Sequence, residues 1–387
     1  MGTGVGQANV PVWAHGGTGS DERGSHFPGL TSQIDADFCV IGLGGSGLAC
    51  IGELLASGVR SSRIVGIDAG AVASGAAGRN GGFLLAGTAD FYHDAIAKFG
   101  RERARRLYEL TVNQIAEIAN ETPAAVRRVG SLRIASSDDE RRDCQAHLSA
   151  LHADAFPGEA YSGPEGEGLL VLTDCAFDPL LRCRLLACRW SDGGVRLYEH
   201  SPVLDIRPRE VRTAGGAVRC DRVIVAVDGR LGSLLPELAS LARAVRLQML
   251  ATAPTTEVWL PRPVYARWGY DYWQQLENGQ VLLGGFRDQG GDAEWTEDAS
   301  PSAPIQQLLE RFLREGLRIR APITHRWAAT VSYSLNGLPV LAEVRPGVIA
   351  TGAYSGTGNV IGALCGRAAA RLALGERAEV AELLDGI

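Results

Sequence analysis

The sequence predicts an α/β fold in which one sheet domain is assembled from separated stretches of chain, with a second, mixed α+β domain inserted between them. Three observations lead to this prediction. A strand, a glycine-rich turn, a helix and a second strand follow one another over residues 37–68. Short strands of similar character recur in the middle and at the end of the chain. Two strand-like runs, 271–276 and 280–284, flank an Asn-Gly turn typical of a hairpin.

The first group of elements is local and well defined. Residues 37–41 form a short apolar strand, and a glycine turn follows it directly. A helix is expected from about 46 to 57, because Gly58 stands in the usual position after a helix end. Residues 63–68 form the second strand, so that strand, helix and strand make a right-handed parallel unit.

The remaining elements alternate between helices and short strands. We expect helices over 92–125, 300–318 and 359–374, and strands over 196–198, 203–206, 223–227 and 347–351. At 387 residues the chain is long enough for roughly two domains. The predicted division is an N-terminal arm of 1–33, a discontinuous nucleotide domain of 34–92, 164–241 and 325–387, and a second domain of 93–163 and 242–324.

Composition narrows the class of protein. A net charge of −6 argues against nucleic acid or an anionic membrane surface as a partner. The 8 cysteines are scattered and form no metal-ligand pattern, so we expect buried thiols in a reducing cytoplasm and no metal site. No signal peptide and no apolar run of about 20 residues is recognised, which predicts a cytoplasmic protein without a membrane span.

The glycine cluster of residues 42–47 lies where a phosphate-binding turn is expected. Gly42 permits the tight turn, Gly44 lets the backbone approach a pyrophosphate, and Gly47 allows close packing of helix on strand. The N–H groups that begin the helix then face the phosphates. Asp68, 21 residues beyond Gly47, can accept hydrogen bonds from a ribose and would repel a 2′-phosphate. The pattern predicts a dinucleotide site, argues against NADP, and leaves FAD and NAD open.

Two further stretches separate FAD from NAD. They are residues 74–82 (Ser-Gly-Ala-Ala-Gly-Arg-Asn-Gly-Gly) and 350–360 (Ala-Thr-Gly-Ala-Tyr-Ser-Gly-Thr-Gly-Asn-Val). Through them the sequence resembles the flavoprotein family of D-amino-acid, glycine and sarcosine oxidases, and particularly its branch of gamma-glutamylputrescine oxidase and related amine oxidases. In that branch the first stretch runs along the flavin ring and the second holds the flavin's pyrimidine edge. The chain departs from the branch at Ala77, where serine is usual, and at Thr357, where histidine is common.

The resemblance implies a discontinuous Rossmann-like FAD-binding domain plus a mixed α+β substrate domain with an antiparallel sheet. It places the adenine near Val203, and residues 223–229 match the family with departures at Val227 and Asp228. The cysteine that anchors flavin covalently in sarcosine oxidases is absent, so FAD is expected to bind non-covalently. The predicted cofactor-binding residues are Gly42, Gly44, Gly45, Ser46, Gly47, Asp68, Ala69, Ser74, Arg79, Asn80, Gly81, Gly82, Val203, Gly229, Gly352, Ser355, Gly356, Thr357, Gly358 and Val360.

Residues 327–339 provide evidence about the class of substrate. Family members that oxidise α-amino acids often place an arginine, which binds the substrate carboxylate, where this chain has Val331. A simple amino acid is therefore disfavoured, although Arg267 or Arg287 can replace that arginine from elsewhere. Aromatic residues at 265–273 can hold an alkylammonium by cation–π attraction. If the strand alternates, Tyr270 and Tyr272 lie on one face and Trp273 on the other. Substrate-facing candidates are Tyr270, Tyr272, Arg267, Trp327, Tyr333 and Tyr354.

These observations predict an FAD-dependent oxidoreductase that oxidises a primary or secondary amine, a small molecule, to an imine by hydride transfer to flavin N5. The cofactor performs the chemistry, so no catalytic triad is expected. One alternative is an amino-acid or N-methyl-amino-acid oxidase or dehydrogenase. Another is a non-catalytic flavin-binding subunit of a complex, and an NAD enzyme requires both flavin-like stretches to be accidental. The identity of the amine, the electron acceptor and the oligomeric state stay open.

Overall fold

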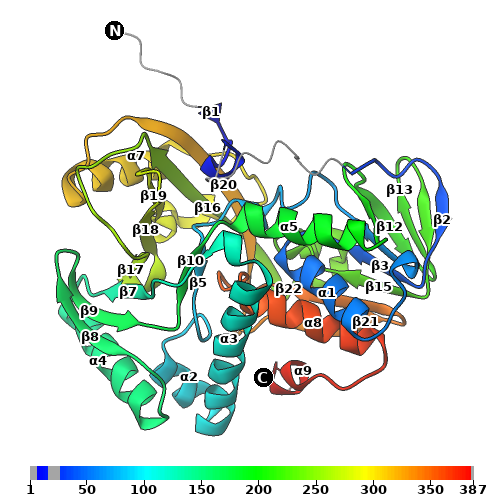
Figure 1. The fold of residues 1–387 in the computed structure, drawn as a ribbon, viewed down its shortest axis with the longest axis horizontal. Coiled ribbons are helices and arrows are strands. Elements are labelled where there is room, and N and C mark those ends of the chain that lie inside the picture. Colours follow the sequence, from blue (N-terminus) through cyan, green and yellow to red (C-terminus); the bar gives the residue numbers. More distant parts are fainter. Residues whose placement is uncertain (1–6, 16–26, 385–387) are drawn as a thin grey trace. The chain divides into compact units, whose positions relative to one another are not determined.

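The structure, a computed structural model, describes residues 7–15 and 27–384 (Figure 1). The chain folds into two compact units, each formed from three separated stretches. Among the described residues, unit 1 contains 7–15, 79–178 and 246–330, and unit 2 contains 27–78, 179–245 and 331–384. Relative to the expected division, 79–92, 164–178 and 325–330 belong to unit 1, and 242–245 belong to unit 2. The first two of these stretches lie in unit 1 because β10 (Cys175–Phe177) pairs with both β5 (Phe83–Leu84) and β6 (Val126–Arg127). The assignment of FAD binding to unit 2 and of substrate binding to unit 1 stays a prediction.

Unit 2 is built on a mixed sheet whose strands follow the order β11-β4-β3-β15-β22-β21. All neighbours from β11 to β22 are parallel, and β21 pairs antiparallel with β22. A smaller sheet has the order β12-β13-β14-β2. The strands of this unit are β2 (Gln33–Asp35), β3 (Phe38–Ile41), β4 (Ile64–Ile67), β11 (Arg196–Tyr198), β12 (Val203–Arg207), β13 (Glu210–Thr213), β14 (Ala217–Arg219), β15 (Arg222–Val225), β21 (Val340–Arg345) and β22 (Val348–Gly352).

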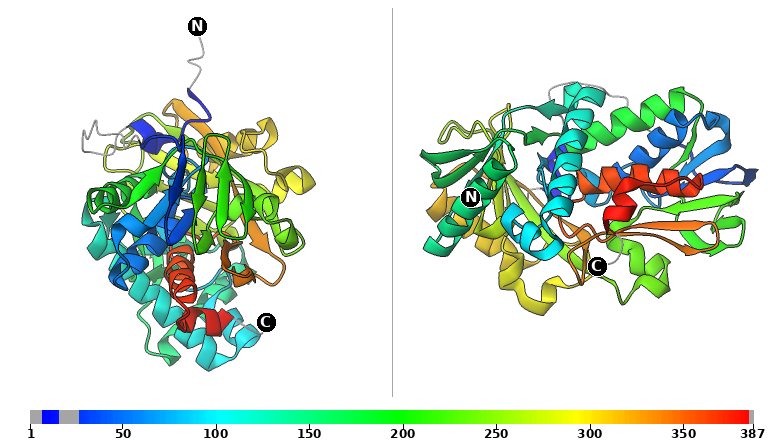
Figure 2. Two further views of the ribbon diagram at one scale, coloured as in Figure 1. Left: turned by 90° about the vertical axis from the view of Figure 1, so that its right-hand side faces the viewer. Right: turned by 90° about the horizontal axis from the view of Figure 1, so that it is seen from below.

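The helices of unit 2 are α1 (Gly45–Ala56), η2 (Ser61–Arg63), η3 (Ala76–Gly78), α5 (Pro179–Asp192), η5 (Asp228–Arg230), α6 (Leu231–Leu234), η6 (Pro236–Leu238), α8 (Ile361–Ala373) and α9 (Glu379–Leu384). Helices α1, α5 and α8 cover one face of the mixed sheet. Leu231 of α6 and Leu238 of η6 instead join the buried cluster on the opposite face. Helix α8, in red, lies beside α1, in blue (Figure 2). Their backbones approach so closely that a Cβ added to Gly366 would lie 2.1 Å from the carbonyl oxygen of Ser46. Glu53 of α1 accepts a hydrogen bond of 2.7 Å from Arg371 of α8.

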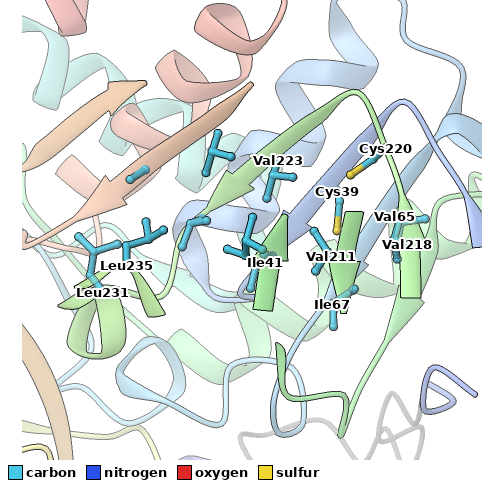
Figure 3. Packing of buried hydrophobic residues seen from close by; sticks show 14 of the residues in the cluster. Cys39, Ile41, Val65, Ile67, Val211, Val218, Cys220, Val223, Leu231 and Leu235 are labelled. Carbon is cyan, nitrogen blue, oxygen red and sulfur yellow. The ribbon is translucent and has the colours of Figure 1, made fainter. Parts of the chain in front are cut away.

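The core of unit 2 lies between its two sheets. Successive side chains of a strand point to opposite faces, and β3 follows this rule. Cys39 and Ile41 enter a buried cluster shared with Val211 and Val218 of the smaller sheet (Figure 3). Val40 points the other way, toward Gly47 of α1. Unit 2 therefore has three layers, of helices, mixed sheet and smaller sheet, and the glycine turn lies at the carboxyl end of β3.

Unit 1 is built on a long sheet of order β1-β20-β16-β19-β18-β17-β7-β9-β8, with a small sheet of order β5-β10-β6. Two of its strands, β16 and β20, extend into unit 2. The strands are β1 (Gln7–Ala8), β5 (Phe83–Leu84), β6 (Val126–Arg127), β7 (Ser131–Ile134), β8 (Glu159–Gly163), β9 (Gly166–Val171), β10 (Cys175–Phe177), β16 (Ala242–Thr252), β17 (Val264–Ala266), β18 (Asp271–Gln275), β19 (Val281–Gly285) and β20 (Ile323–Ser334).

The helices of unit 1 refine two of the sequence predictions. They are η1 (Val12–His15), α2 (Tyr92–Phe99), α3 (Arg101–Glu121), η4 (Pro123–Ala125), α4 (Asp138–Ala153), η7 (Arg267–Gly269), η8 (Arg287–Glu294), α7 (Ala303–Arg311) and the π-helical turn η9 (Phe312–Gly316). The single helix expected over 92–125 is interrupted at Gly100, whose φ of 83° no α-helix accommodates. The helix expected over 300–318 ends in the π-turn.

The Asn-Gly hairpin is observed between β18 and β19, which pair antiparallel. Gly279 has a φ of 85°, as a glycine in such a turn allows. Strand β18 begins at Asp271, so its alternation does not extend to Tyr270. Among residues 7–15 and 27–384, no helix is long and apolar enough to cross a bilayer.

Candidate functional site

The turn between β3 and α1 has room for glycine alone at two positions. Gly42 has a φ of 99°, and a Cβ added there would lie 2.4 Å from the carbonyl oxygen of Ala226. A Cβ on Gly47 would lie 1.8 Å from the carbonyl oxygen of Gly42. Any larger side chain therefore displaces backbone. The physical reasons that the sequence suggested for the first and third glycines are visible in these contacts.

The same turn presents unused hydrogen-bond donors. Within the described chain, nothing accepts a hydrogen bond from the backbone N–H groups of Gly44, Gly45 and Ser46, and α1 has no side-chain cap. Helix N-termini normally satisfy such groups with a cap, water or a ligand. Unused N–H groups and the positive end of a helix dipole together form an anion site. The turn therefore fits a pyrophosphate.

Asp68 follows β4 and faces the turn. Its Oδ2 accepts a hydrogen bond from the N–H of Leu43 (2.8 Å) and its Oδ1 accepts one from the N–H of Gly70 (2.9 Å). Each carboxylate oxygen keeps a second lone pair, which can accept from a ribose hydroxyl. Burial raises the pKa of Asp68 to about 6, and the two backbone N–H groups act in the opposite direction. The carboxylate is therefore the prevailing form at neutral pH.

Arg182 of α5 is a residue of this turn that the sequence analysis missed. It is buried, and its Nη1 atom lies 3.3 Å from the position that a Cβ of Gly45 would occupy. A guanidinium beside N–H groups that face a phosphate adds a full positive charge to the helix dipole. The available signal was an arginine on the otherwise apolar buried side of a helix, a place where a charged residue is rare without a charged or polar partner.

A second missed residue, Glu199, holds the loop after Asp68. Its side chain is buried and accepts hydrogen bonds from the N–H groups of Val72 (2.6 Å) and Phe27 (3.0 Å). The neighbouring Ser201 donates its backbone N–H to the carbonyl oxygen of Asp68. Ala69 and Ser74 are exposed on this loop, and Val203 is half-buried where β12 begins. The backbone around the predicted ribose and adenine positions is thus fixed by polar contacts.

The predicted flavin-facing run, Arg79–Gly82, lies in unit 1. Trp327 donates its Nε1–H to the carbonyl oxygen of Arg79 (2.8 Å), and Arg79 donates its Nε–H to the carbonyl oxygen of Ala328 (2.9 Å). Asn80 accepts from the N–H of Gly82 (2.9 Å). Gly82 has a φ of 77°, and a Cβ there would lie 2.4 Å from the carbonyl oxygen of Phe177. Only glycine fits this position.

The second predicted flavin-facing element, the loop over residues 352–360 in unit 2, is held by Asp228. The carboxylate of Asp228 accepts hydrogen bonds from the N–H groups of Tyr354 and Ser332, both at 3.3 Å. The hydroxyl of Ser332 donates to the carbonyl oxygen of Asp228 (2.9 Å). Burial raises the pKa of Asp228 to about 6. This departure from the family pattern thus fixes the loop, directly beside the buried Gly229 of η5.

The tip of this loop also offers backbone donors. Thr357 donates its hydroxyl to the carbonyl oxygen of Tyr354 (2.6 Å), closing a turn just before α8. In the described chain, the N–H groups of Gly356 and Gly358 have no acceptor. Gly352, Ser355 and Val360 are buried around the turn. Two unused N–H groups close to a helix N-terminus favour a negatively charged oxygen, such as the edge of a reduced flavin.

Tyr354, a predicted substrate-facing residue, has a different role in the structure. Its side chain is buried, and its hydroxyl donates to Ser46 (2.8 Å) and lies 3.1 Å from the hydroxyl of Thr351. The ring packs against Gly358 and Gly362. Tyr354 therefore links the loop to the start of α1 and has no polar group left for a substrate. Sequence spacing alone does not show which way a side chain of a loop points.

Arg267 is likewise engaged. Its Nη2 donates to both carboxylate oxygens of Asp288 (2.6 Å each), and its Nε lies 3.2 Å from Asp271. Its guanidinium stands over the rings of Tyr270 and Phe286. Two carboxylates satisfy this guanidinium, so we withdraw Arg267 as the partner of a substrate carboxylate. Tyr270 is exposed beside it, and the guanidinium of Arg287 lies 5.2 Å from the same ring.

Tyr272 contacts the predicted flavin-facing run. Its ring carbons lie 3.1 Å from the position of a Cβ on Gly81. The ring stacks on Tyr265 at 5.7 Å between centroids and meets Phe83 edge to face at 5.8 Å. Gln274, two residues further along β18, donates to the carbonyl oxygen of Gly81. The aromatic group Phe83, Tyr265 and Tyr272 thus adjoins the run in unit 1.

The last two substrate-facing candidates are Trp327 and Tyr333. Trp327 is fully buried and serves Arg79 through its ring N–H, so it positions the run and is not open to a substrate. Tyr333 is half-buried in unit 2, where it forms a bridge to Tyr354 and its hydroxyl lies 3.2 Å from the position of a Cβ on Gly356. Tyr270, Tyr272 and Tyr333 therefore remain as candidates.

Known proteins match this chain over most of its length. Residues 37–372 match the family described as FAD dependent oxidoreductase. The protein named probable oxidoreductase OrdL of Rhizobium meliloti is 27% identical over 380 residues, covering 92% of this chain and 86% of the relative. The gamma-glutamylputrescine oxidoreductase of Escherichia coli is 27% identical over 379 residues, covering 90% of this chain and 86% of the relative.

Solved structures share the fold. The glycine oxidase of Geobacillus kaustophilus superposes with a TM-score of 0.72 at 19% sequence identity, covering 89% of this chain and 96% of that one. The L-proline dehydrogenase of P. horikoshii gives a TM-score of 0.72 at 16% identity, covering 90% of this chain and 96% of that one. The family match spans most of the chain, including both glycine-rich stretches on which the sequence prediction rested. The chain therefore belongs to the family of FAD dependent oxidoreductases.

Proposed function

We propose that this FAD-dependent oxidoreductase converts a primary or secondary amine that lacks an α-carboxylate into its imine. The observation that carries this proposal is the engagement of Arg267 by Asp271 and Asp288. An α-amino acid needs a guanidinium for its carboxylate, and such a bidentate pair is worth several kilocalories per mole when desolvated. Val331 cannot form that pair, and Arg267 already has two carboxylate partners. The guanidinium of Arg287 stands over the rings of Tyr270 and Trp295. An amine without a carboxylate needs none of these residues.

The aromatic group Phe83, Tyr265 and Tyr272 supports the same substrate class. Aromatic faces attract alkylammonium groups, and Tyr272 contacts Gly81 of the predicted flavin-facing run. One of the curated relatives is named a gamma-glutamylputrescine oxidoreductase, which also points to an amine. These residues would bind and orient the substrate by shape and by cation–π attraction.

The cofactor would be held non-covalently, by backbone groups more than by side chains. In unit 2, the N–H groups of Gly44, Gly45 and Ser46, together with Arg182, would bind the pyrophosphate, and Asp68 would accept from a ribose. The N–H groups of Gly356 and Gly358 would bind the pyrimidine edge. In unit 1, Arg79–Gly82 would lie along the flavin ring. When bound, FAD supplies the hydride acceptor at N5 and passes the two electrons to dioxygen or another acceptor.

The test is an anaerobic titration of the purified holoprotein, followed by the flavin absorbance. The substrates are matched pairs that differ only by the α-carboxylate, such as n-butylamine against norvaline and N-methylbutylamine against N-methylnorvaline. Diamines are tested as well. Bleaching by the amine of each pair, with at least tenfold weaker response to the amino acid, is expected. Bleaching by the amino acids alone would contradict the proposed substrate class and leave FAD binding intact. A protein that holds FAD and responds to neither class would be a non-catalytic flavin carrier.

A further inference from the structure

Residues 7–15 are the first described part of the N-terminal arm predicted over 1–33, and from here on the arm means these residues. They precede the region that matches the family. Strand β1 of the arm pairs parallel with β20 at His325 and Arg326. Val12 and Trp13 are buried, at 4% and 6% exposure. The sequence prediction described this segment only as an extended arm. Its buried residues and strand pairing show that it is an integral part of unit 1.

Asn9 connects the arm to Arg79. The carbonyl oxygen of Asn9 accepts a hydrogen bond of 2.8 Å from Nη2 of Arg79, and its side-chain oxygen accepts from the same atom. The side-chain oxygen also accepts from the N–H of Ala328 (3.1 Å), and the side-chain amide donates to the carbonyl oxygen of Ala299 (3.1 Å). Asn9 has a φ of 60°, a conformation that asparagine tolerates better than most residues. Every polar group of this side chain is therefore used.

Trp13 secures the other end of the run. Its Nε1–H donates to the carbonyl oxygen of Asn80 (2.9 Å). Its Cζ2 atom lies 3.0 Å from the position that a Cβ on Gly82 would occupy. The arm thus contacts Arg79, Asn80 and Gly82, three of the four residues in the predicted flavin-facing run.

The partners of Arg79 are all uncharged. They are carbonyl oxygens and the neutral amide of Asn9, and no carboxylate of the described chain lies within ion-pair distance of the guanidinium. Burial lowers the pKa of Arg79, although a guanidinium stays protonated. An asparagine at position 9 therefore fixes the guanidinium without neutralising it. An aspartate at the same place would fix it and cancel its charge.

We propose that Asn9 is a positioning residue of the cofactor site, and that the arm holds the uncompensated charge of Arg79 where it favours the reduced, anionic flavin. This inference rests on the proposed placement of Arg79–Gly82 along the flavin ring. It assigns to the arm a role in the affinity for the flavin half of FAD and in the reduction potential. The ADP half is bound by the turn in unit 2 and is independent of the arm.

The experiment compares full-length wild type, Asn9→Ala, Asn9→Asp and a matched control, Asn120→Ala. Asn120 accepts a hydrogen bond from Arg128 (2.8 Å) on the exposed surface, so its removal deletes the same side chain from an Asn–Arg pair elsewhere in unit 1. Dissociation constants of the apoproteins for FAD and for ADP are measured together with the flavin midpoint potential. ADP probes the dinucleotide turn alone and reports whether a variant is folded.

In Asn9→Ala we expect FAD affinity to fall about tenfold with ADP affinity unchanged, since one anchor of Arg79 is lost. In Asn9→Asp we expect the oxidised flavin to be favoured over the reduced flavin by about tenfold relative to wild type, which lowers the midpoint potential by about 30 mV. A purely structural role of Asn9 would leave the potential unchanged. Asn120→Ala is expected to match wild type in all three measurements.

Two results would overturn the inference. The first is that both Asn9 variants retain wild-type FAD affinity and potential while Arg79→Met changes them; the arm would then have no part in positioning, and the proposed cofactor site would stand. The second is that Arg79→Met also changes neither quantity, in which case the placement of the run beside the flavin is itself wrong. Deletion of residues 1–15 repeats the test without relying on one side chain, with the FAD-to-ADP affinity ratio as readout.

Discussion

The turn at Gly42–Gly47 in unit 2 and the run at Arg79–Gly82 in unit 1 are proposed to face the same cofactor, yet different parts of the chain stabilise them. The turn is fixed by backbone shape and by its own neighbours, because Gly42 and Leu43 donate to Ile67 and Asp68. The run is fixed by the side chains of Trp13 and Trp327, which lie 67 and 248 residues away from the residues they contact. The glycine pattern therefore specifies the backbone conformation of the turn. In the run the glycines show only where the segment lies in the sequence, and distant side chains fix its conformation.

The largest expected effect comes from Gly47→Ala. Its Cβ would lie 1.8 Å from the carbonyl oxygen of Gly42, so either α1 or the turn must move. We expect a loss of about 3 kcal/mol of stability and no measurable binding of ADP or FAD. Calorimetry and nucleotide titration measure both. Gly29→Ala is the control, since its Cβ would meet its nearest neighbour at an ordinary 3.7 Å. Retained ADP binding in Gly47→Ala would show that the turn is not the dinucleotide site.

Arg182→Met sharpens the comparison by removing charge from the turn while keeping a long side chain. A charge-assisted hydrogen bond contributes about 1.5–3 kcal/mol, so FAD and ADP affinities are expected to fall together by about 10- to 100-fold. The salt dependence of binding should weaken as well. Arg189→Met, on the exposed side of α5, is the control. A loss of FAD affinity with normal ADP affinity would place Arg182 at another part of the cofactor.

Trp327→Phe affects only the run. The ring remains, but its N–H no longer reaches the carbonyl oxygen of Arg79 (2.8 Å in the structure). One neutral hydrogen bond is worth about 1 kcal/mol, which corresponds to about a fivefold weaker binding of FAD. ADP affinity should not change. Trp259→Phe is a suitable control, because Trp259 is 82% exposed. Equal losses for FAD and ADP would mean that the two regions are not separable.

Asp228→Asn tests a titratable side chain in unit 2, where the proposed cofactor contacts are mainly backbone N–H groups. Burial raises the folded-state pKa to about 6, above the usual 3.8 of an aspartate, so this carboxyl favours folding below pH 4 and loses that contribution as pH rises through 6. Between pH 5 and pH 7.5 the wild type should lose about 1 kcal/mol that the variant does not lose. Chemical denaturation at both pH values measures the difference. A pH-independent difference between the two proteins would show that Asp228 titrates normally.

Local patterns predicted the elements of unit 2 well. The strand, turn, helix and strand of residues 37–68 and the strands near 196, 203, 223 and 348 are present, because each is bounded by its own glycine or by a clear apolar run. The hairpin at Asn278-Gly279 is confirmed for the same reason. The break at Gly100 was missed, because the prediction rested on the periodicity of the apolar residues and a single glycine does not change that periodicity.

Side-chain direction and distant partners were beyond the sequence. The engagement of Arg267 by Asp271 and Asp288, and of Tyr354 by Ser46, depends on contacts that no spacing rule contains. Arg182 lies beside Gly45 because α5 packs on α1, more than a hundred residues earlier in the chain. Motifs thus indicated the segments that are proposed to form the site, while tertiary packing decides which of their side chains remain open to a ligand.

The pairing of the N-terminal arm with β20 has a consequence for biosynthesis. Asn9 leaves the ribosome well before its partner Ala328, which follows 319 residues later. At about 5–20 residues per second, that interval is about 15–60 s. During this time the arm has no strand to join, so Asn9 is not held in place beside Arg79. The segment proposed to meet the flavin ring is therefore completed only after β20 has been synthesised.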